Sequence, residues 1–439
     1  MGTFLFFLYN FLTPFIALIY LAFFILSPRR LLLKNLPVEL KERLTPRVGN
    51  LTRGVSPVWI HAASVGELKA IKPVLEKIRK NKPEIPVLIT TSTWSARIAG
   101  LKTNLSTRLI PLDFFPLMKT FIKKLKPRAL ILAETEIWPN LLCLAQSSGI
   151  KIFIVNGRLS NKSYGFYKLI SPLIEKSFKN IEKALVQTRA DAEKYGRFIR
   201  DTGKITITGN IKYDFMQPSD ENEKRTGIGP VTDIIPVIEK LKWRDKPIFT
   251  AGSTHPHEEK IIIDSFMSCR ESHKSLKLVI APRHPETSGE TAALLNSKGL
   301  KFIKWSELSV ERRAESVEEL EAVLVDEIGL LQEFYKIASV AFVGGTLVKI
   351  GGHNLLEPAM FSKPVLFGPD YRNAKEAGDA LLLNRGGFIV HDAGDLSARL
   401  KVMISDKNLL KTVGENAKKT LESLQGATEK TIKILSDYL

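Results

Sequence analysis

The chain has 439 residues, of which 44% are hydrophobic and 25% are charged, and its formal net charge is +18. This length is too great for one ordinary hydrophobic core and predicts two domains, and the apolar content is that of a packed globular protein. The two cysteines, Cys143 and Cys269, have no metal-ligand spacing and suit a reducing compartment.

The chain begins with an uncharged apolar run over residues 3–26, TFLFFLYNFLTPFIALIYLAFFIL. As a helix, this run would be roughly 36 Å long, which is enough to cross a bilayer core. Pro14 is tolerated in membrane helices, and the start lacks the basic residues and the cleavage site of a secretory signal. The run therefore predicts a transmembrane anchor over residues 1–28, and the alternative is an apolar core helix of a soluble protein.

Basic residues follow this run, and they predict which side of the membrane holds the body of the chain: Arg29, Arg30, Lys34, Lys41, Arg43 and Arg47. By the positive-inside rule the body is cytoplasmic. The net charge of +18 also suits a membrane surface rich in anionic lipid. Nucleic acid is the competing partner, but no helix-turn-helix, zinc-finger or aromatic–basic RNA-binding signature occurs, so we expect none.

From Val58 onward, short apolar runs alternate with amphipathic segments. The runs VWIHA, IPVLITT, RALILAE, KIFIVN and KALVQT are rich in β-branched residues and predict buried strands. Between the first two, residues 67–80 place Leu68, Ile71, Leu75 and Ile78 on one helical face. This alternation predicts a parallel sheet with helices on both faces.

The regular pattern stops over residues 214–245, which are polar and contain proline and glycine, and then begins again. The later strands are expected in KPIFTAG, LKLVIAP, AVLVD, SVAFVGG and KPVLFG. The sequence thus predicts an α/β protein with two doubly wound, Rossmann-like domains, over residues 29–220 and 221–439. In such domains, ligands bind at the carboxyl ends of the strands, here in a cleft between the two domains.

Glu67 is the first candidate site residue, in the strand–turn–helix stretch VWIHAASVGELKA. A carboxylate at a helix N-terminus can cap the helix. Alternatively, it can act as a general base that takes a proton from a substrate hydroxyl. The helix N-terminus is expected to keep Glu67 ionised.

Two glutamates, Glu134 and Glu136, end the buried strand in ALILAETEIWPN. Buried carboxylates need partners, so we expect one of them to be structural and the other to reach the site. If the strand continued, alternation would place both on the same face. Lys212 follows the turn at Gly209–Asn210 and is either a surface charge or an inward-pointing cation.

Three stretches of the second domain are candidates for binding a phosphate-bearing ligand. Arg283 follows the strand that ends at Pro282 and suits phosphate recognition, and the alternative is an arginine of the solvated surface. Residues 328–330 are expected to form a strand-to-helix turn, whose backbone groups either contact a nucleotide base or only connect the two elements. In FVGGTLVKIGGHNLLEP, residues 342–358, the glycines free the backbone, a helix is expected to begin near Asn354 and hold a phosphate, and Glu357 can contact ribose hydroxyls.

These motifs carry a family resemblance. HAASVGE, AETEIWPN, ITGNIKYD, AGSTHPHEE, APRHPE and GGHNLLEPA occur in this order after the apolar N-terminus. Over essentially its whole length the chain resembles the transferases of 3-deoxy-D-manno-octulosonic acid (Kdo) in lipopolysaccharide synthesis. The stretch GSTHPHEE departs mildly from the family's usual form at Pro256 and His257.

The resemblance implies a GT-B fold and an inverting transfer of Kdo from CMP-Kdo to the lipid A precursor (lipid IVA), at the cytoplasmic face of the inner membrane. It implies no metal or other cofactor. The first domain would bind the acceptor and the second CMP-Kdo. Glu67 matches the proton acceptor, and Glu134 and Lys212 match the transition-state stabilisers; Lys212 is also a candidate partner for the carboxylate of the sugar. The residues matching the CMP-binding segments are Pro282, Arg283, Ile328, Gly329, Leu330, Asn354, Leu355, Leu356 and Glu357.

Two other functions are weighed against this one. A nucleotide-sugar epimerase of similar fold would need no membrane anchor. A basic, membrane-tethered nucleic-acid-binding protein would bind nucleic acid in a salt-sensitive way and would not bind CMP. Neither accounts for Glu67, Glu134 and the HNLLE stretch together.

Overall fold

The computed structural model describes residues 2–26, 35–45, 54–103, 105–216, 234–310 and 319–439. The chain folds into two compact units. The first comprises Met1–Phe215 and Gln425–Leu439, and the second comprises Met216–Leu424. Each unit is built around a seven-stranded sheet, so the predicted pair of α/β domains is confirmed.

The sheet of the first unit has the strand order β3-β2-β1-β4-β5-β6-β7, and all of its strands are parallel. Its strands are β1 (Val58–His61), β2 (Val87–Thr91), β3 (Ser106–Leu109), β4 (Ala129–Ala133), β5 (Lys151–Gly157), β6 (Lys183–Val186) and β7 (Ile205–Ile207). Strands β1, β2 and β4 are buried along their whole length. This burial explains why they appear in the sequence as continuous apolar runs.

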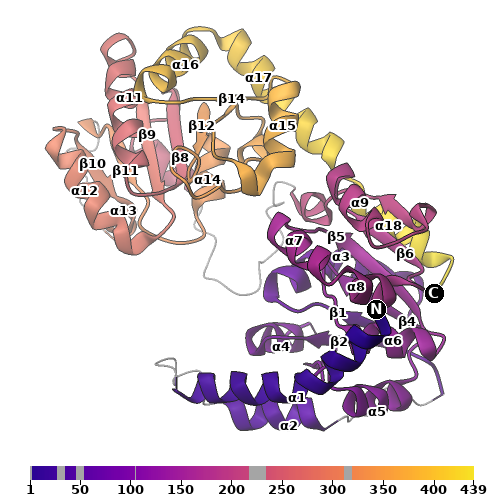
Figure 1. Cartoon of the computed structure of the whole chain (residues 1–439). Coiled ribbons are helices and arrows are strands. Elements are labelled where there is room, and N and C mark those ends of the chain that lie inside the picture. Colours follow the sequence, from indigo (N-terminus) through magenta and orange to yellow (C-terminus); the bar gives the residue numbers. More distant parts are fainter. Residues whose placement is uncertain (1, 27–34, 46–53, 104, 217–233, 311–318) are drawn as a thin grey trace. The chain divides into compact units, whose positions relative to one another are not determined.

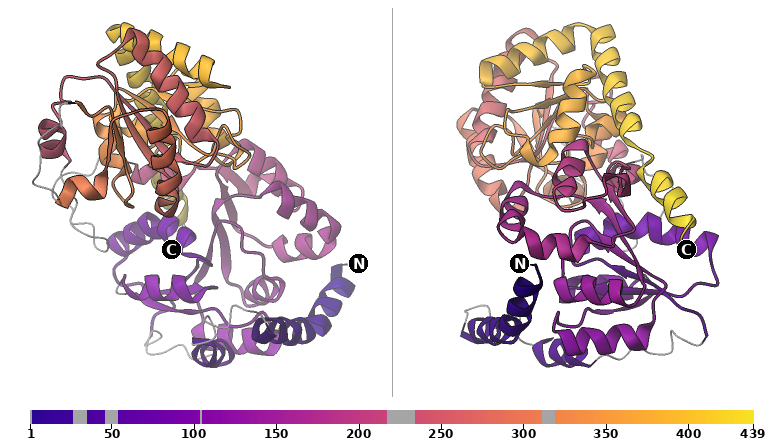
Figure 2. Two further views of the ribbon diagram at one scale, coloured as in Figure 1. Left: turned by 90° about the vertical axis from the view of Figure 1, so that its left-hand side faces the viewer. Right: turned by 45° about the vertical axis from the view of Figure 1, so that its right-hand side comes forward.

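Helices cover both faces of this sheet (Figure 2). They are α1 (Gly2–Leu26), α2 (Leu36–Leu44), α3 (Val65–Asn81), α4 (Trp94–Leu101), α5 (Phe115–Leu125), α6 (Pro139–Ser147), α7 (Asn161–Leu169), α8 (Ser171–Phe178), α9 (Arg189–Gly196) and α18 (Ala427–Ser436), with 3₁₀ turns η3 (Thr202–Lys204) and η4 (Ile211–Phe215). Alternate residues of β1 enter different cores: Trp59 packs with α5 and α6, whereas Ile60 packs with α3. The sheet therefore separates two hydrophobic layers.

The sheet of the second unit is also parallel, with the order β10-β11-β9-β8-β12-β13-β14. Its strands are β8 (Ile248–Thr254), β9 (Lys277–Pro282), β10 (Phe302–Lys304), β11 (Ala322–Leu324), β12 (Val340–Val343), β13 (Val365–Phe367) and β14 (Gly387–Ile389). Leu278 and Ile280 of β9 enter one core, and Val279 and Ala281 enter the other. This unit therefore has two layers as well.

The helices of the second unit are α10 (Ile235–Lys240), α11 (Glu258–Ser272), α12 (Ser288–Ser297), α13 (Trp305–Val310), α14 (Leu331–Ile337), α15 (Lys375–Leu383), α16 (Ala393–Ser405) and α17 (Lys407–Leu424), with 3₁₀ turns η5 (Pro285–Thr287), η7 (Pro358–Phe361) and η8 (Arg372–Ala374). Helices α11 and α16 pack side by side against one face of the sheet (Figure 1). Phe334 of α14 packs in the other layer.

The division of the chain differs from the expected 29–220 and 221–439 because its last helix, α18, returns to the first unit. Ala427, Ile432 and Leu435 of α18 enter the core that α3 covers. The Asp214 carboxylate accepts backbone N–H bonds from Gly426 at 2.7 Å and Thr428 at 2.5 Å, and so caps the start of α18. Most of the predicted linker, residues 217–233, lies outside the described residues.

The predicted N-terminal helix is present as α1, but it does not support the expected anchor over residues 1–28. Among the described residues, no helix has the length and the hydropathy of a membrane span. Helix α1 packs against α8, and the Tyr9 hydroxyl donates a hydrogen bond to the Asp113 carboxylate at 2.8 Å. Of the basic residues after the apolar run, Arg29, Arg30, Lys34 and Arg47 lie outside the described residues.

Candidate active site

Glu67 lies in the first turn of α3, just beyond the carboxyl end of β1. The Ser64 hydroxyl accepts the Glu67 backbone N–H at 3.2 Å. In return, the Glu67 carboxylate accepts the Ala63 backbone N–H at 2.7 Å and the Ser64 hydroxyl at 3.1 Å. This reciprocal arrangement resembles a capping box, in which Ser64 caps α3 and the Glu67 carboxylate supports the cap from the first turn. A carboxylate has about four lone-pair positions, so the same group can also accept a proton.

Glu134 and Lys212, predicted separately from the sequence, form an ion pair. The Lys212 Nζ atom is 2.7 Å from the Glu134 Oε1 atom, and the side chains are 46% and 23% exposed. Glu134 has a positive φ of 55°, which is uncommon for a residue with a side chain and clusters at functional sites. Strand β4 ends at Ala133, so the expected alternation along a continuing strand does not apply.

Glu136 is held by two groups of the first unit. The Trp138 indole N–H donates to Glu136 Oε2 at 2.7 Å, and the His61 Nε2 atom is 3.6 Å from the same oxygen. His61 is fully buried at the end of β1, and its Nδ1 atom is 2.9 Å from the Thr90 hydroxyl. Glu136 is therefore the glutamate with structural partners. The sequence reasoning missed His61. The signal for it was available, since a histidine at the end of the buried apolar run VWIH needs a polar partner.

These glutamates act on one another electrostatically. Burial raises the pKa of Glu67 above its ordinary value, and the negative charges of Glu136 and Glu134 raise it further. The bonds from Ala63 and Ser64 oppose this effect without overcoming it. Burial therefore outweighs the local hydrogen bonds in setting the direction of the pKa shift of Glu67. A raised pKa brings a carboxylate closer to the range in which a general base works best.

In the second unit, the glycine-rich loop after β12 is organised by a carboxylate that the sequence reasoning missed. Glu258, the first residue of α11, is fully buried. Its Oε1 atom accepts the backbone N–H groups of Thr346 at 2.9 Å and Leu347 at 2.7 Å. Its Oε2 atom accepts those of Gly345 at 2.7 Å and His255 at 3.1 Å. These loop N–H groups are therefore already bonded within the protein.

The loop does not lead into the expected helix at Asn354. Residues 355–357 form a turn, and a short 3₁₀ segment begins at Pro358. Because Pro358 has no N–H, it cannot donate to the Asn354 carbonyl, which is the bond that would begin an α-helix there. The Asn354 side chain instead accepts the Leu356 N–H at 3.2 Å and lies 3.3 Å from the Glu357 carboxylate. No helix N-terminus is available at Asn354 to bind phosphate.

The predicted CMP-binding residues occupy three places in the second unit. Arg283 is exposed and directly follows β9, which ends at Pro282. Ile328, Gly329 and Leu330 form the expected turn before α14, and Ile328 is 72% exposed. The side chains of Leu355 and Leu356 are fully buried, so these two residues can contact a ligand only through their backbone.

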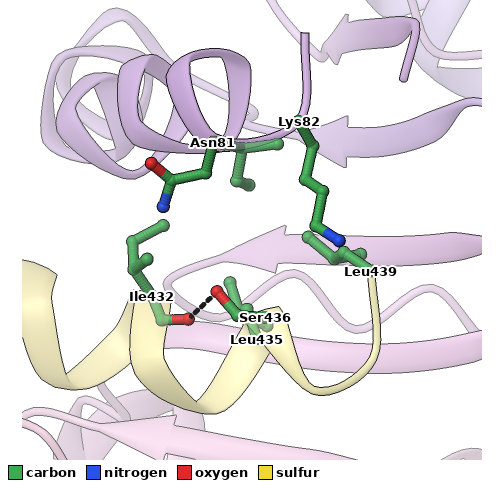
Figure 3. A pocket seen from close by; sticks show the side chains of 7 residues that line it. Asn81, Lys82, Ile432, Leu435, Ser436 and Leu439 are labelled. Carbon is green, nitrogen blue, oxygen red and sulfur yellow. Dashed lines mark hydrogen bonds between the residues drawn. The ribbon is translucent and has the colours of Figure 1, made fainter. Parts of the chain in front are cut away.

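A small hollow in the first unit lies away from all these residues, between α3 and α18 (Figure 3). Its volume is about 10 Å³, which is room for about one water molecule. It is lined by Ile78, Asn81, Lys82, Ile432, Leu435, Ser436 and Leu439. A hollow of this size cannot hold a nucleotide or a sugar.

Solved structures with the same fold are found among enzymes of nucleotide sugars. A glycosyltransferase from Rickettsia africae superposes with a TM-score of 0.56 at 13% identity, over 88% of this chain and 99% of the other. The UDP-GlcNAc 2-epimerase from Neisseria meningitidis superposes with a TM-score of 0.58 at 14% identity, over 87% of this chain and 100% of the epimerase chain. Two parallel seven-stranded sheets with such neighbours define a GT-B-like fold.

Sequence comparison identifies the family within this class. A family model described as 3-deoxy-D-manno-octulosonic-acid transferase (kdotransferase) matches residues 39–215. The transferase of this name from Haemophilus influenzae is 31% identical over 407 residues, 91% of this chain and 92% of the relative. The transferase of this name from Chlamydophila psittaci is 32% identical over 340 residues, which cover 75% of this chain and 73% of the relative. The chain belongs to the Kdo transferase family and is a glycosyltransferase.

Proposed function

We propose that this chain transfers Kdo from CMP-Kdo to a hydroxyl group of the lipid A precursor lipid IVA, with inversion at the anomeric carbon. The observation that carries this proposal is the group of acidic side chains and Lys212 in the first unit. There, the raised pKa of Glu67 reflects burial and the nearby charges of Glu136 and Glu134, and Glu134 is paired with Lys212. Membership of the Kdo transferase family supports the identity of the sugar.

In the proposed reaction, the acceptor oxygen bonds to the anomeric carbon while the bond from that carbon to the CMP phosphate oxygen breaks. CMP leaves with the bonding electron pair, and the hydroxyl proton passes to the Glu67 carboxylate. Attack from the side opposite the leaving phosphate inverts the configuration. A positioned base typically contributes about 10²–10⁴-fold to such a step.

The Glu134–Lys212 pair suits the charges that develop on the donor sugar. Positive charge grows at the anomeric carbon as CMP leaves, and the Glu134 carboxylate can stabilise it. An ammonium group has three N–H donors, and the bond from Lys212 to Glu134 Oε1 uses one of them. A second N–H of Lys212 can bind the carboxylate of the keto acid. The pair thus offers a negative charge to the anomeric carbon and a positive charge to the carboxylate of the sugar.

The second unit is proposed to hold the nucleotide. Arg283 supplies a cation beside the carboxyl end of β9. A guanidinium group can bind phosphate through two parallel N–H···O hydrogen bonds. The exposed turn at residues 328–330 can face the base, and Glu357 can accept hydrogen bonds from ribose hydroxyls. Leu355 and Leu356 would contribute their backbone groups, since their side chains are buried.

We also propose that α1 holds the chain at the cytoplasmic face of the inner membrane. Large apolar side chains lie exposed along one side of this helix, at helical spacing: Phe4, Phe7, Leu8, Phe11, Leu12 and Phe15. The net charge of +18 suits a surface of anionic lipid and a phosphorylated acceptor. Protease added outside intact spheroplasts should leave the body uncut; its removal would refute this location.

The test of the proposed reaction is to incubate the purified chain with CMP-Kdo and bisphosphorylated lipid A precursor. We expect a product heavier by one or more Kdo units, with the new linkage showing by NMR the anomeric configuration opposite to that of the donor. A product that retains the configuration would refute inversion. Release of free Kdo without transfer to lipid would refute the acceptor.

A further inference from the structure

Three histidines of the second unit follow adjacent parallel strands, so they gather at one edge of the sheet. His255 follows β8, His284 follows β9, and His353 lies in the glycine-rich loop after β12. The Nε2 atoms of His255 and His353 are 2.8 Å apart, and their ring planes are parallel to within 4°. The rings meet edge to edge, because stacked faces would keep ring atoms about 3.5 Å apart.

Two imidazoles joined in this way share a single N–H, because one Nε2 atom must donate and the other must accept. One added proton makes the pair a cation and keeps the hydrogen bond. A second added proton would bring two N–H groups against each other. The His255–His353 pair can therefore carry a charge of zero or one.

The charged groups around the pair are mostly positive. Arg283 and His284 face it from the end of β9, and Glu258 faces it from α11. The Glu258 carboxylate is already bonded to four backbone N–H groups. Among the residues that the structure describes, no carboxylate forms a salt bridge with His255, His353 or Arg283. The negative groups nearest the pair already have other partners, because Glu258 binds backbone N–H groups and the Glu286 carboxylate lies 3.5 Å from His284 Nδ1.

The surroundings of the pair favour its uncharged form. Burial, followed by the charges of His255, Arg283 and His284, lowers the pKa of His353 to about 4. Burial also lowers the pKa of His255; Glu258 raises it in part, and His284 and Arg283 lower it further. Both rings therefore have pKa values below that of an ordinary histidine, and a bound anion would reverse this effect.

The glycine-rich loop positions His353 and does not itself cradle an anion. The N–H groups of Gly345, Thr346 and Leu347 bond to Glu258. Those of Gly352 and His353 bond to carbonyl groups within the loop. A Cβ atom at Gly345, whose φ is +71°, would lie 3.1 Å from the His353 ring. The side chains, rather than these backbone groups, are left to bind an anion.

We propose that the His255–His353 pair, together with Arg283 and His284, binds the phosphate of the nucleotide donor and takes up one proton when it does so. This proposal rests on the proposed function, because it assigns a phosphate subsite within the same nucleotide-binding unit. The pair becomes a cation as the phosphate arrives, so it adds a positive charge where the anion needs one. Affinity for the phosphate then rises as pH falls, by about tenfold per pH unit at the steepest.

The experiment is calorimetric titration of the full chain with the methyl ester of cytidine 5′-phosphate. This probe has one phosphate charge that does not titrate near neutral pH, so any proton exchanged comes from the protein. Titration at pH 7 in buffers of different ionisation enthalpy counts the protons taken up. We expect a substantial fraction of one proton for the unaltered chain, and no uptake with cytidine, which lacks phosphate.

Two variants assign that proton to the pair. His353→Gln and His255→Gln should each abolish the uptake and weaken binding by roughly tenfold to a hundredfold. His391→Gln, at an exposed histidine of the same unit, should change neither. Tight binding without proton uptake, or uptake that persists in both pair variants, would overturn the inference and leave the proposed function standing. Failure of the probe and of CMP-Kdo to bind would overturn both.

Discussion

Replacing Glu258 should strongly destabilise the second unit. The Glu258 side chain is fully buried, and its two oxygens accept four backbone N–H groups, three from the glycine-rich loop and one from His255. In Glu258→Ala, these four donors lose their acceptor at once. A buried donor without a partner costs about 1–3 kcal/mol.

At the lower bound, four such groups correspond to a loss of about 4 kcal/mol in the free energy of unfolding. For a unit of about 200 residues, each kcal/mol shifts Tm by about 2–4 °C, so we expect a decrease of about 8–16 °C. Glu258→Gln keeps one oxygen and places an N–H₂ group against the other two donors. Its decrease should therefore be intermediate.

Calorimetric unfolding of the full chain measures these shifts, and titration with CMP-Kdo measures the consequence for the loop. We expect Glu258→Ala to weaken donor binding, because the loop that holds His353 loses its attachment to α11. Glu271→Ala is the matched control, since Glu271 is exposed on the same helix and its loss should change stability by about 0.5 kcal/mol or less. An Ala variant at position 258 that unfolds like the unaltered chain would refute the reasoning.

Three further predictions concern the first unit. Because burial raises the pKa of Glu67 above that of an ordinary glutamate, kcat/KM should fall as pH decreases through this raised pKa, where the base becomes protonated; a pH–rate profile without this acid limb would contradict it. Glu134→Ala and Lys212→Ala should each change the free energy of unfolding by less than about 1 kcal/mol, because the pair is partly exposed. Their effects on turnover in a double-mutant cycle should be non-additive, and simple additivity would show that the pair does not act as a unit. Asp214→Ala should destabilise the first unit by about 1–2 kcal/mol in a denaturant titration, because α18 loses its N-terminal cap; an unchanged midpoint would show that water replaces the cap.

The sequence predicted the layered architecture well, for a physical reason. Strands covered on both faces must be apolar along their whole length, and Val58–His61 and Ala129–Ala133 are buried throughout. Residues at the carboxyl ends of those strands were therefore sound candidates for a site. The structure places Glu67 and Glu134 there and pairs Glu134 with Lys212, which is distant in sequence.

What the sequence did not predict depends on contacts between distant residues. The return of α18 to the first unit rests on Asp214 and on a core that only the folded chain assembles. The pKa of Glu67 depends on burial, which its place in the first turn of a helix does not reveal. The role of Glu258 depends on a loop almost ninety residues later in the chain. By contrast, Pro358 was a local signal against a helix at Asn354.

The central claim is that the Glu67 carboxylate takes the acceptor proton, and a comparison of two glutamine variants tests it most directly. Glu67→Gln and Glu76→Gln alter the same helix, and Glu76 is exposed. With saturating CMP-Kdo and lipid A precursor, we expect Glu67→Gln to lose about 10²–10⁴-fold in turnover. Its CMP binding and Tm should change little, because glutamine can still accept the Ala63 N–H, and Glu76→Gln should match the unaltered chain. Retained turnover in Glu67→Gln, with a lower Tm, would show instead that Glu67 only caps α3.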